Sequence, residues 1–325
     1  MHILIVNDTL IPAKDYGGTE RVIWCLGKEL VGLGHQVSYL VAEGSVCPFA
    51  KRVLSYDPGR SIHDQVPDDV DFVHLFFQIP EPLKKSYLIT HEGNYHQGAF
   101  DANTVFVSAN HAKRNGSNVF VFNGIDPDEY GRVDFDKKRQ HLLYLAHDKR
   151  PEKNLKGCID MAYHAGRERL VVVGGRRRFN VNGLAWWVNY RGMVGGEVKN
   201  RILNASKALL FPVLWHEPFG MAVIEAMYFG CPVFGTTYGS LPELVPNEAG
   251  FLSNSRLALI DAVKHWEQYD ARKIHAYACE SFSAKKMAQD YLKKYEIVLN
   301  GQTLNPHTLL KSDNYIRGNL LPMDP

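Results

Sequence analysis

The chain has 325 residues, 45% of them hydrophobic and 22% charged, which excludes a disordered or fibrous protein and is enough for two domains of ordinary size. Its formal net charge of +2 argues against a strongly basic nucleic-acid-binding protein. The five cysteines are widely spaced within or beside apolar stretches, so we expect buried thiols and neither a disulfide framework nor a zinc site. Without a basic leader or a long apolar run, the sequence predicts a cytoplasmic protein.

Short apolar runs alternate with longer amphipathic segments, which is typical of parallel sheets covered by helices. In the first half of the chain we expect strands at 3–6, 37–41, 70–75, 87–90, 105–107 and 119–122, and a helix at 19–31. In the second half we expect strands at 142–145, 170–173, 189–191, 208–211 and 233–234, and helices at 155–166, 219–229, 256–268 and 284–299. The sequence therefore predicts an α/β fold of two doubly wound units whose strand ends face each other across a cleft.

A glycine pair, Gly17-Gly18, follows the first predicted strand and opens a helix. Ligands of open α/β sheets bind beyond the carboxyl ends of the strands, and a helix N-terminus reached through glycine favours an anion. A G-x-G-x-x-G fingerprint is absent from this position, and the chain contains no G-x-x-x-x-G-K-[ST], which excludes a P-loop. The pair by itself leaves a phosphate-binding loop and an ordinary loop equally open.

Two glutamates, Glu217 and Glu225, lie around the start of the predicted helix 219–229. Eight helical residues advance about 12 Å, whereas two carboxylates that act on one glycosidic bond stand about 5–9.5 Å apart. We therefore expect the pair to hold opposite ends of one elongated ligand, with the N–H groups of Phe219, Gly220 and Met221 facing anionic oxygens between them. A simpler interpretation stays open, in which Glu217 complements the helix dipole and Glu225 forms a buried salt bridge.

The stretch 212–227 resembles glycosyltransferase family 4, whose members have the GT-B fold of two Rossmann-like domains. Its E-x7-E arrangement continues into Gly230-Cys-Pro-Val and Leu241-Pro-Glu. Other matches follow in order: Gly17-Gly18, Asn123-Gly-Ile-Asp126, Pro151-Glu-Lys153, Tyr190-Arg-Gly-Met193-Val194, and Phe282-Ser with Tyr291-Leu-Lys-Lys-Tyr295. The resemblance covers nearly the whole chain, although residues 65–85 match only loosely.

The resemblance implies a role for each matching position. Glu225 would bind the ribose hydroxyls of a nucleotide-sugar donor, and Glu217 with the N–H groups of residues 219–221 would hold the transferred sugar. Met193 would border the base, and Lys153 would neutralise the diphosphate. His91, directly after the predicted strand 87–90, would lie near the reacting centre.

One departure concerns the residues before Lys153. Family members carry Gly-Arg there, and the Arg also contacts the diphosphate, whereas this chain has Ala146-His147. Because histidine is mostly neutral at pH 7, we expect either that His147 becomes protonated beside the diphosphate or that Lys149 or Arg150 supplies the charge. The expected catalytic residues are His91, Lys153 and Glu217, and the expected donor-binding residues are Gly17, Gly18, His147, Arg150, Met193, Phe219, Gly220, Met221 and Glu225.

The resemblance implies a retaining glycosyltransferase of the hexosyltransferase type that uses a UDP- or GDP-sugar and a glycan or lipid-linked acceptor. Residues 1–135 would form the acceptor-side domain, with the segment from about 284 to 325 packing back on it, and residues 136–283 would form the donor domain. No ligand cluster suggests Mg²⁺, so we expect no metal requirement. Two alternatives stay open, a nucleotide-sugar-binding protein that has lost catalysis and a GT-B nucleotide-sugar epimerase, as does peripheral contact with a membrane.

Overall fold

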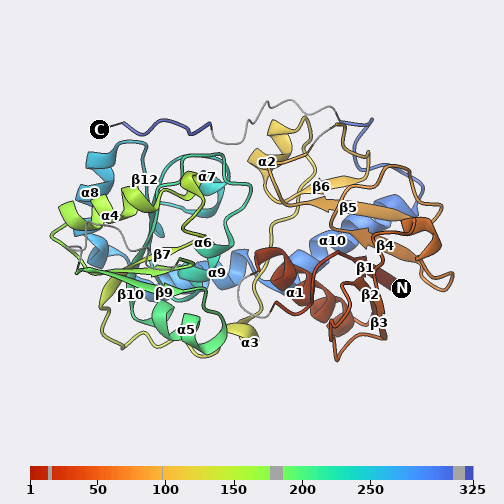
Figure 1. Ribbon diagram of the computed structural model, residues 1–325, viewed down its shortest axis with the longest axis horizontal. Helices are drawn as coiled ribbons and strands as arrows, with labels where there is room; N and C mark the ends of the chain where they lie inside the picture. The colour runs from red at the N-terminus through yellow and green to blue at the C-terminus, as the bar shows by residue number, and fades with distance from the viewer. Residues whose placement is uncertain (14–16, 97, 176–185, 310–318, 325) are drawn as a thin grey trace. The chain divides into compact units, whose positions relative to one another are not determined.

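The computed structural model describes residues 1–13, 17–96, 98–175, 186–309 and 319–324, and divides them into two compact units. The first unit comprises Met1–Asp126 and the described part of Phe282–Tyr315 (Figure 1). The second comprises Pro127–Ser281 and the described part of Ile316–Pro325. Each unit has its own sheet and its own hydrophobic core.

The first unit contains a six-stranded parallel sheet in the order β3-β2-β1-β4-β5-β6. The strands are β1 His2–Val6, β2 Gln36–Val41, β3 Arg52–Ser55, β4 Phe72–Leu75, β5 Tyr87–His91 and β6 Thr104–Phe106. The helices described in this unit are α1 Gly18–Gly32, α2 Ala109–Arg114 and α10 Ala284–Leu299, with a short 3₁₀ helix, η1, at Ile62–Asp64.

The second unit also contains a six-stranded parallel sheet, in the order β12-β11-β10-β7-β8-β9. The strands are β7 His141–Leu145, β8 Leu170–Val173, β9 Val188–Gly192, β10 Ser206–Phe211, β11 Val233–Gly235 and β12 Gly250–Leu252. The helices are α3 Pro127–Tyr130, α4 Leu155–His164, α5 Gly196–Asn204, α6 Met221–Tyr228, α7 Leu241–Leu244, α8 Arg256–Lys264 and α9 Ala271–Ser281, with 3₁₀ helices η2 at Pro151–Lys153 and η3 at Trp266–Gln268.

Both sheets have the strand order of a Rossmann fold, with a switch point where the order reverses. The switch lies between β1 and β4 in the first unit and between β7 and β10 in the second. Ligands of such sheets bind at the carboxyl ends of the strands beside this point. The predicted fold class, two Rossmann-like doubly wound α/β units, is confirmed.

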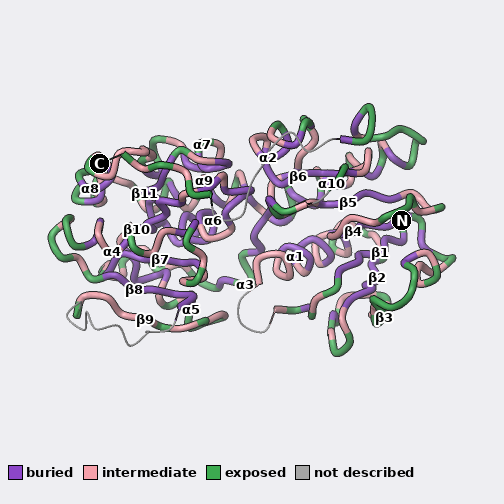
Figure 2. The backbone as a smooth tube through the Cα atoms, turned by 45° about the horizontal axis from the view of Figure 1, so that its top comes forward, coloured by how far each residue is buried: buried purple, intermediate pink, exposed green. Residues whose placement is uncertain are grey.

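Burial follows the position of each strand in its sheet. β1 and β8 are buried along their whole length and appear purple in Figure 2, because helices cover both faces of a parallel sheet. β3 and β9 lie at sheet edges and are mostly of intermediate burial. Edge position alone does not decide burial, however, because the edge strand β6 is buried throughout.

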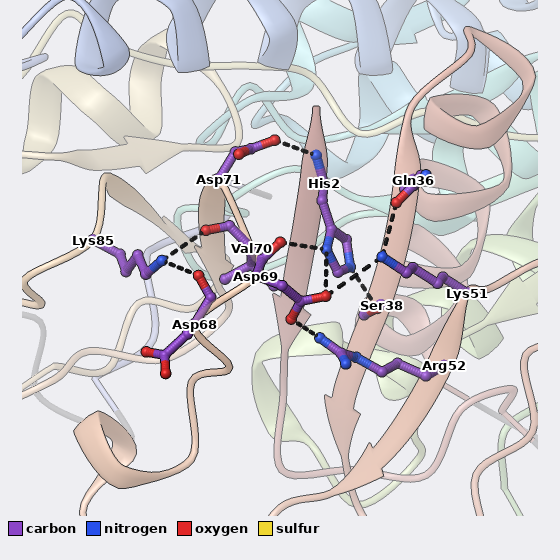
Figure 3. Close-up of polar contacts among 10 residues, drawn as sticks. All are labelled: His2, Gln36, Ser38, Lys51, Arg52, Asp68, Asp69, Val70, Asp71 and Lys85. Atoms are coloured by element: carbon purple, nitrogen blue, oxygen red, sulfur yellow. Dashed lines mark hydrogen bonds and ion pairs between the residues drawn. The ribbon is translucent and has the colours of Figure 1, made fainter.

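Polar contacts fasten the amino ends of the first sheet (Figure 3). The backbone N–H of His2 donates to Asp71 Oδ2 at 2.7 Å, and its imidazole lies 2.8 Å from both the Asp69 carbonyl oxygen and Ser38 Oγ. The Asp69 carboxylate accepts from the Arg52 guanidinium on β3. These bonds join the start of β1 to β2, to the edge strand β3 and to the turn before β4.

Some predicted elements differ from the structure. The predicted strand at 119–122 is wrong, since Phe120 makes a single bridge with Phe106 and no ladder. The helix predicted at 219–229 begins only at Met221, because Gly220 has a left-handed φ of 100°. The helix predicted at 256–268 ends at Lys264 and continues as η3.

The two units separate between Asp126 and Pro127, upstream of the boundary predicted at 135/136. The residues in between pack on the second unit through the side chain of Asn204 in α5. Asn204 Oδ1 accepts the Asp134 N–H at 2.9 Å, and its Nδ2 donates to the Arg132 carbonyl oxygen at 3.2 Å. These contacts fix the connecting segment to the second unit.

The end of the chain divides between the units. α10 packs against α1 and β5 in the first unit. The described tail, 319–324, which the sequence places with the first domain, lies on the second unit instead, where Asp324 bridges to Ser255 and the Leu321 N–H donates to Leu214. Residues 310–318 lie outside the described residues.

A buried chain of hydrogen bonds fastens α10 to the first sheet. His74 Nδ1 lies 2.7 Å from the Tyr295 hydroxyl, and its Nε2 lies 2.8 Å from Thr90 Oγ1, which is 2.8 Å from the Tyr291 hydroxyl. All four side chains are buried. Burial lowers the pKa of His74 to about 3, because the charged imidazolium would lose its hydration.

This histidine is expected to make folding sensitive to acid. Because its folded-state pKa lies below the ordinary value of 6.5, His74 contributes stability above pH 6.5 that is lost as the pH falls toward 3. Between pH 7 and 4 the loss is about 3 kcal/mol of unfolding free energy. Urea unfolding across this range should show a flatter pH dependence for His74→Phe than for the wild type. The exposed-site control His307→Phe should keep the wild-type slope, and an unchanged slope for His74→Phe would contradict the assignment.

Candidate functional site

The carboxyl ends of three neighbouring strands in the second unit carry the central residues of the candidate site. Lys153 lies in η2 after β7, Glu217 follows β10, and Gly239 follows β11. Because β7, β10 and β11 are adjacent in the sheet, their connecting segments meet at one edge beside the switch point.

Lys153 and Glu217 form a buried ion pair. The Lys153 Nζ lies 2.6 Å from Glu217 Oε2, and the indole N–H of Trp215 donates to the same oxygen at 2.7 Å. The two charged side chains are only 11% and 7% exposed. Burial lowers the pKa of Lys153, while the Glu217 carboxylate acts in the opposite direction. The structure therefore brings together two of the three predicted catalytic residues.

A second predicted cation, Arg150, lies beside this pair. The Arg150 guanidinium and the Lys153 ammonium lie 4.7 and 4.8 Å from the ring centre of Trp215, within the range of cation–π contacts. Arg150 also binds Glu152 Oε1 at 2.7 Å. Each cation thus has a glutamate partner, so an anionic ligand here would meet two positive charges that are already partly offset.

His147 lies in the loop after β7 with 40% of its side chain exposed. Its Nδ1 accepts the Lys149 N–H at 3.1 Å and lies 3.6 Å from an Asp148 carboxylate oxygen. An accepting Nδ1 places the ring proton on Nε2. Arg150, one of the predicted substitutes for the family arginine, lies with Lys153 at the ring of Trp215.

Two glycines shape the turn between Glu217 and α6. Gly220 caps the helix with φ 100°, so that Phe219 and Gly220 precede the first helical residue, Met221. Gly239 has φ 68°, and a Cβ there would lie 2.2 Å from the Glu217 backbone nitrogen. Only glycine permits this approach. Of the three predicted N–H groups, those of Phe219 and Gly220 therefore lie in the turn, and that of Met221 lies at the N-terminus of α6.

Glu225, inside α6, has a lysine partner of its own. The Lys199 Nζ lies 2.6 Å from Glu225 Oε1, and the Tyr130 hydroxyl donates to the same oxygen at 2.7 Å. Lys199 also lies 5.2 Å from the ring centre of Tyr130, and all three residues are buried. The buried salt bridge that the sequence left open is therefore present. Glu217 and Glu225 belong to two separate ion pairs.

Sequence reasoning missed Lys199, Tyr130 and Trp215. Lys199 and Leu203 are buried one turn apart in α5, so a lysine at an apolar position of an amphipathic helix was the available signal. Tyr130 came from the segment predicted to connect the domains and carried no signal. Trp215 lies within the stretch that indicates the site, but its place two residues before Glu217 gives no signal that its indole N–H donates to that glutamate.

Met193 lies at the edge of the same sheet. It follows β9 directly after Gly192, whose φ is 76°, and it is 37% exposed. One strand, β8, separates β9 from β7. Met193 therefore shares the carboxyl edge of the sheet with Lys153 but belongs to a more peripheral strand.

The remaining predicted site residues belong to the first unit. Gly18 begins α1, and its N-cap Gly17 has φ −178°, an extended conformation that any residue adopts. Backbone conformation therefore does not require glycine at Gly17. His91 ends β5, and its ring centre lies 4.8 Å from that of Phe100 and 5.5 Å from that of His111.

Glu92, which carries no sequence signal of its own, follows the end of β5 and connects it to the start of α1. Its carboxyl group accepts from the Thr19 hydroxyl in the first turn of α1 and from Asn123 Nδ2 at 3.4 Å. Burial raises the pKa of Glu92 to about 7. The end of β5 and the first turn of α1 therefore share a buried carboxyl group whose pKa is raised toward neutrality.

Within the described ranges, no three His, Cys, Asp or Glu side chains are grouped so that they could hold a metal ion. Among the described helices, none combines the length and the apolar character needed to cross a bilayer.

Residues 139–267 match the family model described as "Glycosyl transferases group 1". The chain is 28% identical to a sucrose synthase of Solanum tuberosum over 159 residues, which make up 40% of this chain and 20% of that protein. The matched part is therefore about a fifth of the length of that relative.

Two solved structures show the likeness of the fold. AviGT4, a glycosyltransferase involved in avilamycin A biosynthesis, matches with a TM-score of 0.80 and 22% identity over 93% of this chain and 99% of its own. HepE of Anabaena, solved in complex with UDP and glucose, matches with a TM-score of 0.66 and 16% identity over 90% of this chain and 99% of its own. Both match over both units, in agreement with the GT-B fold class predicted from the sequence.

Proposed function

We propose that the chain is a retaining, metal-independent glycosyltransferase of the hexosyltransferase type, which moves a sugar from a UDP- or GDP-sugar to a glycan or lipid-linked acceptor. The observation that carries the proposal is the buried ion pair of Lys153 and Glu217 at the switch point of the second unit. Both residues lie in the segment that matches the glycosyl transferases group 1 model. The presence of UDP and glucose in the HepE structure supports a UDP-sugar as donor.

In this proposal the donor diphosphate lies beside Lys153 and Arg150. Negative charge develops on the leaving phosphate as the C1–O bond of the sugar breaks, so a cation fixed beforehand stabilises the transition state more than the ground state. Lys153 suits this role because its ammonium is largely withdrawn from water, where charge interactions are stronger. Glu217, held through one oxygen by Lys153 and Trp215, would then orient hydroxyls of the transferred sugar.

The two ends of the donor would be held by other elements of the second unit. The N-terminus of α6, with Phe219, Gly220 and Met221, offers N–H groups and a positive dipole end to anionic oxygens. Glu225 would accept hydrogen bonds from the ribose hydroxyls, and Met193 would border the base. The acceptor would bind to the first unit. From that unit Gly17 and Gly18, at the start of α1, would help to bind the donor, and His91, at the end of β5, would lie near the reacting centre.

One observation keeps a second function open, a nucleotide-sugar-binding protein without catalysis. His147 stands where a fixed cation is expected, and Arg150 and Lys153 each have a carboxylate partner, which lowers the net positive charge available to a leaving group. A nucleotide-sugar epimerase would bind the same donor and rearrange it without an acceptor.

A thermal-shift screen with UDP-, GDP- and ADP-sugars, followed by product analysis, tests the proposal. We expect one nucleotide class to raise the melting temperature, and the stabilising donor to yield transferred sugar with retained anomeric configuration when glycan acceptors are added and EDTA is present. Isomerised donor would indicate an epimerase, and stabilisation without any product would indicate a binding protein. Stabilisation by none of the donors would contradict the donor site itself.

A further inference from the structure

The second unit has a hollow at the amino ends of its strands. It measures about 450 Å³ and is lined by Arg167, Arg169, Trp186, Trp187, Val188, Asn189 and Tyr190. Arg169 directly precedes β8 and Trp187 directly precedes β9. Met193 follows the other end of β9, whose five residues span about 16 Å, so the hollow and the donor-site edge lie at opposite ends of the sheet.

The aromatic lining of the hollow is exposed to an unusual degree. The side chain of Trp186 is 81% exposed, whereas tryptophan side chains in folded proteins are on average largely buried. Its ring centre lies 6.2 Å from that of Trp187, which in turn lies 5.4 Å from that of Tyr163 at the end of α4. The buried Trp187 Nε1 has no hydrogen-bond partner among the described residues. Flat aromatic faces with an unsatisfied N–H donor suit a ring that is apolar on one face and carries hydroxyls at its edge.

The cations of the hollow are Arg167 and Arg169. Within the described part of the chain neither guanidinium has a carboxylate partner, and Arg167 lies 5.3 Å from the ring centre of Tyr163. The nearby Glu168 does not neutralise them, because Lys207 binds its carboxylate at 2.7 Å. Paired donors on a planar guanidinium recognise carboxylate and phosphate groups.

The backbone at Arg167 has the left-handed conformation that commonly follows the end of an α-helix, here α4. Arg167 has φ 56°, in the left-handed region where a residue with a side chain is disfavoured and glycine is at home. Asn154 is the other described non-glycine residue with positive φ, and its side chain caps α4. The Arg167 backbone N–H donates to the Tyr163 carbonyl oxygen at 2.8 Å where α4 ends, and its guanidinium lies 3.5 Å from the Tyr163 hydroxyl.

We propose that this hollow binds an acidic saccharide, with a sugar ring against Trp186 and its carboxylate or phosphate substituent on Arg167 and Arg169. The volume is in the range of small-molecule sites and suits one or two sugar rings. The proposal concerns binding alone and stands whether or not the chain transfers sugar. A membrane surface fits less well, since Trp186 is the one apolar residue of the lining that is exposed and it stands beside two arginines.

Titration of the full chain with trigalacturonic acid, followed by calorimetry and tryptophan fluorescence, tests the site, with maltotriose as the neutral counterpart. We expect the acidic trisaccharide to bind and maltotriose to bind at least about tenfold more weakly. Trp186→Ala and Arg167→Gly should each weaken binding about tenfold or more. Because glycine accepts a left-handed φ, Arg167→Gly should keep or raise the melting temperature, which separates lost recognition from lost folding. Phe251→Ala, on the opposite edge strand β12, is the matched control and should bind as the wild type does.

Several outcomes would overturn the proposal. They are absence of binding, equal binding of maltotriose, unchanged affinity in both variants, and displacement of the saccharide by UDP, which would place it in the donor site. Binding to vesicles of phosphatidylcholine and phosphatidylglycerol that is lost in Trp186→Ala, without saccharide binding, would assign the hollow to a lipid surface instead.

Discussion

Replacing Lys153 with methionine is expected to lower kcat/KM for sugar transfer by about a thousandfold, the upper range for removal of one preorganised electrostatic contact. Methionine keeps much of the aliphatic bulk against Trp215 and Phe211 but removes the ammonium from Glu217 and from the proposed diphosphate position. The comparison requires steady-state kinetics with the donor identified by thermal shift. A variant with wild-type kcat/KM would contradict the role of Lys153.

The same substitution should also destabilise the second unit, and this effect must be separated from catalysis. Removing one partner of a buried ion pair leaves an uncompensated charge and costs about 3–5 kcal/mol. The double variant Lys153→Met with Glu217→Gln removes both charges, so its urea midpoint should recover toward the wild type while transfer stays lost. Lys156→Met, an exposed position in α4, controls for loss of a positive charge and should retain both stability and activity. Recovery of activity in the double variant would show that the pair is structural.

Most interior elements of the fold could be predicted because buried strands and helix faces require apolar residues at neighbouring or periodic positions in the sequence. The predicted bounds of β8 equal its observed bounds, since an interior strand of a parallel sheet, covered on both faces, reads as an unbroken apolar run. The edge strand β3, with residues Arg-Val-Leu-Ser, escaped prediction because its side chains are half-buried and its position depends on distant contacts such as that of Arg52 with Asp69. Residues 119–122 show the converse case. The run is mostly apolar and so predicts a strand, but it pairs with the sheet through a single bridge.

The charged residues of the site could be named from sequence, but their pairing could not. The expected distance of about 12 Å between Glu217 and Glu225 assumes that all eight residues are helical. In the structure the helix begins only at Met221, after Glu217. The partners of these glutamates come from other elements: Lys153 from η2 and Lys199 from α5. A sequence pattern reports where a carboxylate lies along the chain, and only the tertiary fold decides which cation reaches it.

Replacing Glu225 with glutamine is expected to weaken UDP binding by about 10- to 100-fold. A hydrogen bond from a ligand hydroxyl to a charged acceptor contributes about 1.5–3 kcal/mol, and the neutral amide of glutamine is the weaker acceptor. The wild type should prefer UDP over 2′-deoxy-UDP by a similar factor, and Glu225→Gln should bind both alike. Isothermal titration of both nucleotides against both proteins measures the two preferences.

A comparison of Lys199 and Glu225 variants distinguishes a ligand-binding role of Glu225 from a purely structural one. Lys199→Met leaves the buried Glu225 carboxylate without its cation, so it should lower stability. Arg256→Met breaks an ion pair with Asp160 in the same unit and should cost much less, because the two side chains of that pair are 35% and 38% exposed. If Glu225 only balances Lys199, both the Glu225 and the Lys199 variants should melt earlier yet discriminate between UDP and 2′-deoxy-UDP as the wild type does. Discrimination is the decisive quantity, because removing a hydroxyl from the ligand changes one contact and leaves the folding of the protein untouched.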